Sequence, residues 1–366
     1  MKNKPCRYNA SFFKLKKVKT VSASAKQDLD WKNLGFEYTK TDYRFSAIYE
    51  DGVWSEGELV SSEIIQIHEG APALHYAQQC FEGLKAQTSE DGRVLLFRPE
   101  LNAQRMGITA ERLSMPIVSD ELFLHGVMKA VKANQSWIPP YGSGASLYIR
   151  PLLIGVGENM GLKPAKRYEF RVMVSPVGPY YKSGGLSVIS LAVSDIDRAA
   201  PHGTGDVKAG ANYPVGLYAT RKAKELGANE ALYLDSAEHR YLEEAGSANI
   251  IIAQANNKLI TPKSDAILPS ITRRSIMTIA EQEVGMQVEH RPIDLRAEID
   301  SFLEVAACGT AAVLSPVGKI WLDGGWHSFI EEDQVGPVMQ KLYDLLCQLQ
   351  CGEREDLFNW TEEVKF

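Results

Sequence analysis

The feature that most constrains this chain is one lysine placed among small residues. Lys208 lies within residues 203–214, which contain three glycines and two alanines. A second run of small residues, 243–249, begins with two glutamates. Glycine lacks a side chain and is used where the backbone must approach another group closely. Because most lysines are solvated surface charges, the glycine clustering is the observation that favours a functional role for Lys208.

An amine and a distant carboxylate are the two groups that a pyridoxal phosphate site requires. The amine forms a Schiff base with the cofactor's aldehyde, and the carboxylate keeps the ring nitrogen protonated. A lysine attacks the aldehyde only as the neutral amine, so burial or a nearby cation must lower its pKa. Lys208 and Glu244 are therefore the candidates for these two roles.

Seven segments resemble, in order and spacing, those of the branched-chain-amino-acid aminotransferases. They are Cys80-Phe81-Glu82-Gly83-Leu84-Lys85-Ala86, Leu96-Phe97-Arg98-Pro99, Ser146-Leu147-Tyr148-Ile149-Arg150-Pro151, Gly205-Asp206-Val207-Lys208-Ala209-Gly210-Ala211-Asn212-Tyr213, Glu244-Ala245-Gly246-Ser247-Ala248-Asn249, Leu268-Pro269-Ser270-Ile271-Thr272-Arg273-Arg274 and Cys308-Gly309-Thr310-Ala311. The resemblance implies an α+β chain of fold type IV, with two domains, an active site in the interdomain cleft, and a homodimer.

In this resemblance, Lys208 anchors pyridoxal 5'-phosphate and also moves the proton between the substrate and the cofactor. Tyr213 matches the tyrosine that bonds the cofactor's phenolic oxygen; the alternative is an aromatic packed before Pro214. Glu244 matches the acid at the ring nitrogen. If the strand is extended there, Glu243 points to the opposite side, and we interpret it as a surface acid.

The cofactor's phosphate needs hydrogen-bond donors. Ile271 and Thr272 stand where a helix is expected to begin, and helix N-termini bind anions. Thr310, in a second turn of small residues, offers a similar donor. Arg98 matches the expected charged clamp, although an arginine beside a proline is also typical of a surface ion pair. Arg273 and Arg274 are interpreted as solvated or paired with acids.

The substrate pocket must accept an aliphatic side chain and, in the other half-reaction, a second carboxylate. Tyr148 and Arg150 share one face of a strand, so both can line one cavity; an ordinary structural pair is the alternative. Arg150 is the candidate cation for the carboxylate of glutamate. The residues that the resemblance places in substrate binding are Tyr76, Phe81, Tyr148, Arg150, Tyr180, Thr310 and Ala311.

The length of 366 residues allows two domains with separate cores. The densest proline and glycine stretch lies near the middle of the chain, so we place the interdomain connection at 176–186. It separates a small N-terminal α/β domain, 31–175, from a larger C-terminal domain, 187–366. Helices are expected at 101–113, 120–134, 214–226 and 273–284 and within 329–351, and strands at 94–97 and 146–154.

Residues 1–30 form a basic extension, since 1–27 contain eight basic side chains and no acid. It is interpreted either as an organellar transit peptide or as a disordered tail on a cytoplasmic protein. The five cysteines are scattered, which favours a reduced compartment and predicts no metal site. Cys347 and Cys351 are expected to pack in a core. The net charge of −6 disfavours nucleic acid as a partner, and no apolar run is long enough to span a membrane.

The resemblance implies transfer of the amino group between L-leucine, L-isoleucine or L-valine and 2-oxoglutarate, by a ping-pong mechanism. Its partners would be amino acids and 2-oxo acids. Another fold type IV enzyme, a D-amino-acid aminotransferase or an aminodeoxychorismate lyase, is one alternative. A non-catalytic cofactor-binding protein is a second. Mammalian members of the family have a Cys-x-x-Cys redox pair after the Gly-Thr-Ala turn, but Ala312 and Ser315 occupy those positions here.

Overall fold

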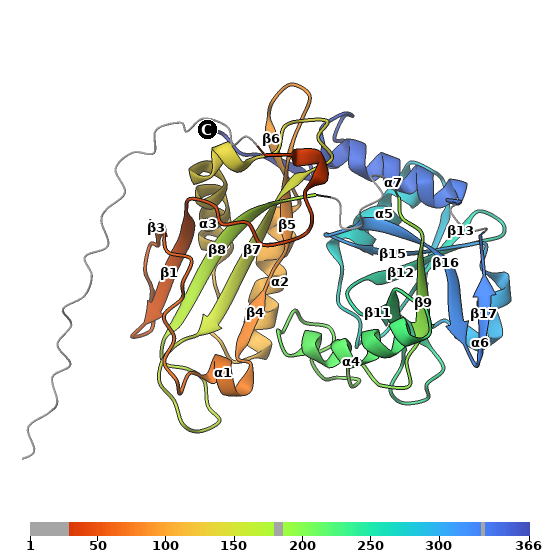
Figure 1. The fold of residues 1–366 in the computed structure, drawn as a ribbon, viewed down its shortest axis with the longest axis horizontal. Helices are drawn as coiled ribbons and strands as arrows, with labels where there is room; N and C mark the ends of the chain where they lie inside the picture. Colours follow the sequence, from red (N-terminus) through yellow and green to blue (C-terminus); the bar gives the residue numbers. More distant parts are fainter. Residues whose placement is uncertain (1–28, 179–185, 331–333) are drawn as a thin grey trace, which may run out of the picture.

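The structure is a computed structural model that describes residues 29–178, 186–330 and 334–366 (Figure 1). Two β-sheets, each with its own helices, form the two halves of the molecule. The chain is therefore an α+β protein of two domains, as expected. The predictions for residues 1–28, for most of the connection 176–186 and for Tyr180 lie outside the described residues.

The first sheet consists of antiparallel pairs. Its path runs β18-β6-β5-β7-β8-β1-β2, with β3 paired to β1 and β4 paired to β7. The strands are β1 (Arg44–Glu50), β2 (Val53–Trp54), β3 (Glu58–Val60), β4 (Gln79–Phe81), β5 (Leu84–Thr88), β6 (Val94–Phe97), β7 (Ser146–Gly155), β8 (Tyr168–Val177) and β18 (Thr361–Glu363). The predicted strands at 94–97 and 146–154 are confirmed as β6 and β7.

The second sheet is mixed. Its path runs β11-β10-β9-β16-β15-β12-β13-β14, and β17 pairs with β16. Parallel pairs join β9 to β10, β9 to β16 and β13 to β14. The strands are β9 (Ile189–Val193), β10 (Glu230–Leu234), β11 (Leu242–Ala245), β12 (Asn249–Gln254), β13 (Lys258–Pro262), β14 (Gln287–Arg291), β15 (Glu304–Gly309), β16 (Val313–Leu322) and β17 (Gly325–Ser328).

The helices cover these sheets. They are α1 (Pro72–Tyr76), α2 (Pro99–Arg112), α3 (Asp120–Ala133), α4 (Asn212–Glu225), α5 (Ile271–Gln282), α6 (Leu295–Glu298) and α7 (Pro337–Gln350), with short 3₁₀ turns η1 (Trp31–Asn33), η2 (Gln135–Trp137) and η3 (Ile299–Ser301). The predicted helices exist, but α2, α4 and α5 each begin two residues earlier than expected. Ser270 caps α5 by accepting a hydrogen bond from the backbone of Arg273. Among the described residues, no helix has the length and apolar character that crossing a membrane requires.

Each sheet has its own hydrophobic core. In the first domain Phe45, Phe123 and Phe170 meet between the sheet and α3, and the rings of Phe123 and Phe170 are 5.9 Å apart. In the second domain, Ile276 of α5 and Leu346 of α7 lie in one buried cluster with residues of the sheet. Two separate cores explain why the chain forms two domains joined along a cleft.

The chain's C-terminal end corrects one domain bound. We expected all of 187–366 in the second domain, but β18 pairs with β6 and extends the first sheet. Val364, just after β18, is buried in the first core. The pairing occurs because α7 crosses back toward the first domain at the top of the molecule (Figure 1). The remaining domain bounds stay a prediction.

Candidate active site

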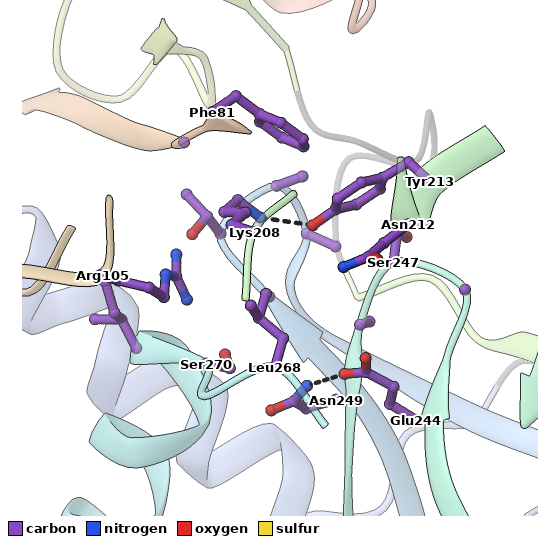
Figure 2. A pocket seen from close by; sticks show the side chains of 18 of the residues that line it. Phe81, Arg105, Lys208, Asn212, Tyr213, Glu244, Ser247, Asn249, Leu268 and Ser270 are labelled. Carbon is purple, nitrogen blue, oxygen red and sulfur yellow. Dashed lines mark hydrogen bonds between the residues drawn. The ribbon is translucent and has the colours of Figure 1, made fainter. Parts of the chain in front are cut away.

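A cavity of about 580 Å³ opens between the two domains and contains most of the predicted site. Phe81 of β4 and Arg105 of α2 come from the first domain, while Lys208, Glu244 and Ile271 come from the second. Figure 2 shows Phe81, Arg105, Lys208 and Glu244 around the cavity, each from a separate element. The interdomain position agrees with the expectation from the sequence.

The Lys208 loop is held against the edge of β4. The Gly210 amide donates to the carbonyl of Gln79 at 3.1 Å, and the Lys208 amide donates to the hydroxyl of Thr109 at 3.0 Å. A side chain at Gly210 would begin only 2.0 Å from the Gln79 amide group. Glycine at position 210 therefore leaves room for the Gln79 side chain, while the backbone hydrogen bond to Gln79 keeps the loop against the first domain.

The Lys208 amine points into the cavity and donates to the hydroxyl of Tyr213 at 2.9 Å (Figure 2). Tyr213 is in the first turn of α4, so the early start of this helix brings the hydroxyl back toward the amine. Burial, and then the cationic Arg105, lower the pKa of Lys208 to about 8. Burial also raises the pKa of Tyr213, which keeps its hydroxyl protonated. The amine is thus readily available in its neutral form.

Glu244 stands on a different wall of the cavity, on β11. Its carboxylate lies 2.9 Å from the Arg198 guanidinium and accepts a hydrogen bond from Asn249 (Figure 2). Burial raises the pKa of Glu244 to about 7, and Arg198 opposes that shift. Glu243 faces away from the cavity, as predicted, but it is not a surface acid. It is 2% exposed, accepts a hydrogen bond from Ser264, and burial raises its pKa.

Ile271, Thr272 and Thr310 gather at a third wall. Ile271 and Thr310 line the main cavity, and Thr272 lines a small adjoining cavity of about 30 Å³ together with Thr310. Ile271 and Thr272 form the first turn of α5, where backbone N–H groups lack partners within the helix. This wall can therefore bind an anion.

Arg98 does not belong to the cavity lining, so its predicted role as the anion clamp is corrected. It precedes α2 with a φ of 49°, and its guanidinium lies 4.4 Å from the centre of the Trp360 ring. It also donates to the hydroxyl of Ser275 at 2.9 Å. These contacts hold the side chain against α5 and the C-terminal segment instead of in the cavity.

Arg105 lines the cavity on the side where Ser270 lies, and sequence reasoning missed it (Figure 2). Its guanidinium forms a buried ion pair with Glu82, with a shortest distance of 2.7 Å. Burial opposes ionisation of Glu82, but Arg105 and Asn102 outweigh it and lower the pKa of that carboxyl. One signal in the sequence could have identified Arg105: Asn102, Arg105 and Thr109 are polar residues spaced to share one helical face. The structure buries all three.

Phe81, Tyr148 and Arg150 form the fourth wall. Tyr148 and Arg150 share a face of β7, as predicted, and Arg150 donates to the Tyr148 hydroxyl at 2.9 Å. The guanidinium also stacks over the Phe81 ring at 4.7 Å. Its Nε is buried and has no hydrogen-bond partner within the described parts of the chain. Phe36, which had no motif to indicate it, joins this wall and packs edge-on against Tyr148.

Two predicted substrate residues are not in this wall. Tyr76 ends α1, is 44% exposed and does not line the cavity of its own chain. Tyr180 lies outside the described residues. Ala311 follows Thr310 in the turn between β15 and β16 and does line the cavity.

Comparisons with known proteins agree on one family. The model for amino-transferase class IV matches residues 79–320. The branched-chain-amino-acid aminotransferase of Haemophilus influenzae is 50% identical, over 93% of this chain and 100% of its own length. That of Helicobacter pylori is 49% identical, over 92% and 98%.

The chain belongs to the branched-chain-amino-acid aminotransferase family of class IV.

Solved structures of this aminotransferase family share the fold. The Escherichia coli branched-chain amino acid aminotransferase has a TM-score of 0.74 and 28% identity, covering 89% of this chain and 100% of its own. The enzyme of Thermobaculum terrenum, solved in its PLP-bound holo-form, has a TM-score of 0.74 and 22% identity, covering 89% and 99%. The fold type IV assignment is thereby confirmed.

The cavity of this class IV aminotransferase fits pyridoxal 5'-phosphate. An amine, a buried carboxylate and a helix N-terminus lie on three separate walls. The cofactor's aldehyde requires the amine, its ring nitrogen requires the carboxylate, and its phosphate requires the donors of the helix N-terminus. A buried carboxylate whose pKa is raised to about 7 also gains from a cationic partner such as a protonated pyridine. The donor set is thus the one that this cofactor needs.

Proposed function

We propose that the chain catalyses pyridoxal 5'-phosphate-dependent transamination of L-leucine, L-isoleucine and L-valine with 2-oxoglutarate. The products are branched 2-oxo acids and L-glutamate. The observation that supports this most is the joint placement of Lys208, Tyr213 and Glu244 around one cavity. The relatives with this family's name, aligned over nearly the whole chain, support the substrate class.

Three residues are proposed to hold the cofactor, and a fourth positions one of them. When bound, pyridoxal phosphate supplies a ring that withdraws electrons from the substrate's Cα. Lys208 would hold the cofactor at its aldehyde carbon, and its amine would carry the substrate's Cα proton. Glu244 would keep the ring nitrogen protonated, and Arg198 positions that carboxylate through an ion pair. Tyr213 would donate to the phenolic oxygen, since its hydroxyl lies next to the Lys208 amine.

The phosphate is proposed to lie at the N-terminus of α5. The amides of Ile271 and Thr272 and the Thr310 turn would donate hydrogen bonds to it. Arg105, in place of Arg98, would supply the positive charge, since it is the arginine on that side of the cavity. Glu82 holds the guanidinium in position through a buried pair.

The substrate is proposed to bind beside Phe81, Tyr148 and Phe36, which form an apolar wall suited to a branched side chain. Arg150 would neutralise the second carboxylate of glutamate, since its buried Nε has donor capacity left. The amides of Thr310 and Ala311 would receive the α-carboxylate that all the substrates share. One cavity therefore serves both substrates in turn, which is what a ping-pong reaction requires.

We also propose that two copies of this chain form a homodimer. Tyr76 is 44% exposed and Met160 is 91% exposed, and the Tyr76 hydroxyl bonds the Met160 backbone. Leu217 of α4, the helix that follows the Lys208 loop, is another exposed apolar residue. Figure 1 shows α1 and α4 at the same end of the two domains. Exposed apolar residues gathered in this way are typical of an interface. In a dimer Tyr76 would reach the partner's cavity.

Sedimentation of the purified protein tests the dimer. Met160→Asp should convert it to monomers, because a carboxylate would then be buried in the apolar interface. Lys341→Asp, on the exposed side of α7, is the control and should remain dimeric. Monomers in the unchanged protein would contradict the proposal.

A reduced, cytoplasmic location is proposed from the cysteines. Cys80, Cys308, Cys347 and Cys351 are free thiols in the structure. Residues 1–27 still permit organellar import, and fusing them to a fluorescent protein in a eukaryotic cell would separate the two interpretations. Import of the fusion would contradict the cytoplasmic proposal.

The decisive experiment is a half-reaction titration of the yellow, cofactor-loaded protein. L-Leucine, L-isoleucine and L-valine should each convert the absorbance to that of the amine form of the cofactor, and 2-oxoglutarate should restore it. Lys208→Ala is the matched control and should show no conversion. Conversion by D-alanine in place of the L-amino acids would favour a D-amino-acid aminotransferase. Release of pyruvate from aminodeoxychorismate would favour the lyase, and no conversion at all would favour a non-catalytic protein.

A further inference from the structure

A second cavity lies between the domains, on the other side of the Thr310-Ala311 turn. Its volume is about 340 Å³, within the range of about 300–1,000 Å³ that is usual for small-ligand sites. One wall is β5, where Lys85 and Gln87 lie on the same face of the strand. The opposite wall is α7, where Tyr343, Cys347 and Gln350 face the cavity at helical spacing.

Two cysteines of α7 and its C-terminal end, both expected to pack in a core, line this cavity. Cys347 packs against the second domain's core, as expected, and also lines this cavity, whereas Cys351 lines the cavity without joining that core. Their thiols stay neutral, because burial raises the pKa of Cys347 to about 12 and that of Cys351 to about 11. They therefore present weakly polar, uncharged surface to whatever fills the cavity.

Lys85 is a cation without a carboxylate partner. Its amine donates to the backbone carbonyl of Ala311 at 2.7 Å, and no acid of the described residues lies within ion-pair distance. Glu353, the acid in the lining, is exposed and accepts a hydrogen bond from Tyr141. Burial lowers the pKa of Lys85 to about 8, because the ammonium group is removed from water and no anion compensates its charge.

The rest of the wall is largely uncharged. Pro140, Ala145, Ala312 and Val313 supply apolar surface next to the amine. A cation at one end and apolar surface around it match a ligand with one carboxylate and a short hydrocarbon chain.

The two cavities share a wall. Ala311 and Ala312 line both of them, and the carbonyl that accepts the hydrogen bond from Lys85 belongs to this shared turn. A ligand that draws the Lys85 amine away from Ala311 therefore acts directly on that turn. Any such coupling is reciprocal, so substrate in the first cavity must alter binding in the second.

We propose that this second cavity is a binding site for a small branched monocarboxylate, with Lys85 as its counter-ion and α7 and Val313 around its hydrocarbon chain. The site is separate from the catalytic cavity, and its ligand has the same chemical class as the proposed substrates and products. The choice of a branched carboxylate as ligand rests on the proposed transamination. The effect of the ligand on the shared turn depends only on the contact between Lys85 and Ala311.

The test requires a catalytic cavity that is already filled. N-(5'-phosphopyridoxyl)-L-leucine, prepared beforehand by borohydride reduction of pyridoxal phosphate with L-leucine, is therefore bound to the apoenzyme, and binding of one such molecule per chain checks the proposed cofactor and substrate site independently. Titration of 4-methylpentanoate into this blocked enzyme by calorimetry should then show one further site per chain. No binding to the blocked enzyme would overturn the proposal while leaving the transamination intact.

Three variants identify the site. Lys85→Met should weaken the binding of 4-methylpentanoate at least tenfold, and Lys85→Arg should retain most of it. Cys351→Leu, which reduces the space without touching the turn, should also weaken binding tenfold or more. Lys341→Met removes an exposed lysine of α7 and is the matched control. Binding that survives both Lys85→Met and Cys351→Leu would place the ligand elsewhere and overturn the proposal.

Inorganic phosphate is the probe that separates charge from shape. It should compete with 4-methylpentanoate only weakly, because it cannot use the apolar wall. Equal competition would mean a general anion site and would overturn the assignment to a branched carboxylate.

Discussion

The carboxylate of Glu244 lies 2.9 Å from the guanidinium of Arg198, and both side chains are buried in the wall of the interdomain cavity. Asn249 donates to the same carboxylate. These two contacts orient the Glu244 side chain toward the cavity. The neighbouring Glu243 has neither contact and points the other way. The geometry therefore distinguishes between two adjacent acids that differ little in the sequence.

Replacing Glu244 by Gln should lower kcat by roughly 10²–10³-fold, the usual cost of losing a group that stabilises developing charge. The amide keeps the hydrogen-bonding shape but cannot hold a proton on a pyridine nitrogen. Cofactor should remain bound, as its absorbance will show. Glu243→Gln is the matched control and should change kcat little; equal losses in the two variants would mean that both acids act together.

The apoenzyme should react with pyridoxal phosphate faster as the pH rises through about 8, because that is where the Lys208 amine becomes neutral. An ordinary surface lysine would show this rise only near pH 10.4. Stopped-flow absorbance measures the rate. Borohydride labelling and peptide mapping should then find the cofactor on Lys208. Lys85, whose pKa is also lowered to about 8, is the internal control, and a label there would contradict the assignment.

Arg150→Ala should slow the glutamate half-reaction more than the leucine half-reaction. A charged hydrogen bond contributes about 2 kcal/mol, so the difference should reach roughly 30-fold. Single-turnover absorbance with each amino acid measures it. Arg150→Lys should recover part of the loss, since it restores the charge without the planar donor geometry. An equal loss with both amino acids would assign Arg150 to the shared α-carboxylate or to structure.

Arg105 rather than Arg98 should determine phosphate affinity. Removing Arg105 alone would leave Glu82 as an unpaired buried charge, so the informative variant is Glu82→Gln with Arg105→Gln. The affinity of this double variant for pyridoxal phosphate should fall at least roughly 30-fold, because a charged hydrogen bond is lost. Glu82→Gln alone should lower that affinity less. Arg98→Gln should leave the affinity near that of the unchanged protein, as equilibrium dialysis can measure. A larger loss for Arg98→Gln than for the double variant would restore the role expected from the sequence.

Mild peroxide should leave transamination intact. Ala312 and Ser315 hold no thiols, Cys308 is 1% exposed, and burial raises its pKa to about 12. Oxidation requires an accessible thiolate. Activity before and after peroxide, with and without added thiol, measures the effect. Inactivation that a thiol reverses would contradict this, and Cys308→Ser and Cys80→Ser would show which cysteine is responsible.

Several site residues could be predicted from the sequence because they lie in recognisable motifs, which carry more information than the periodicity of apolar residues. Lys208 and Glu244 are of this kind, and both line the predicted cavity. Arg98 and Arg105 show the limit of such reasoning. Arg98 stands in a distinctive run but bonds to Trp360 and Ser275, whereas Arg105 stands inside an ordinary helix and reaches the cavity. Only the direction in which α2 packs decides between them.

The sequence by itself determined the local elements and the chemical groups, because capping residues, glycines and apolar periodicity act over a few neighbouring positions. The tertiary structure alone decided three things. It returned β18 to the first sheet, buried Glu243 against Ser264, and formed a second cavity between β5 and α7. Each depends on segments far apart in the chain meeting in space, and such contacts are set by how the two domains pack rather than by any local pattern of residues.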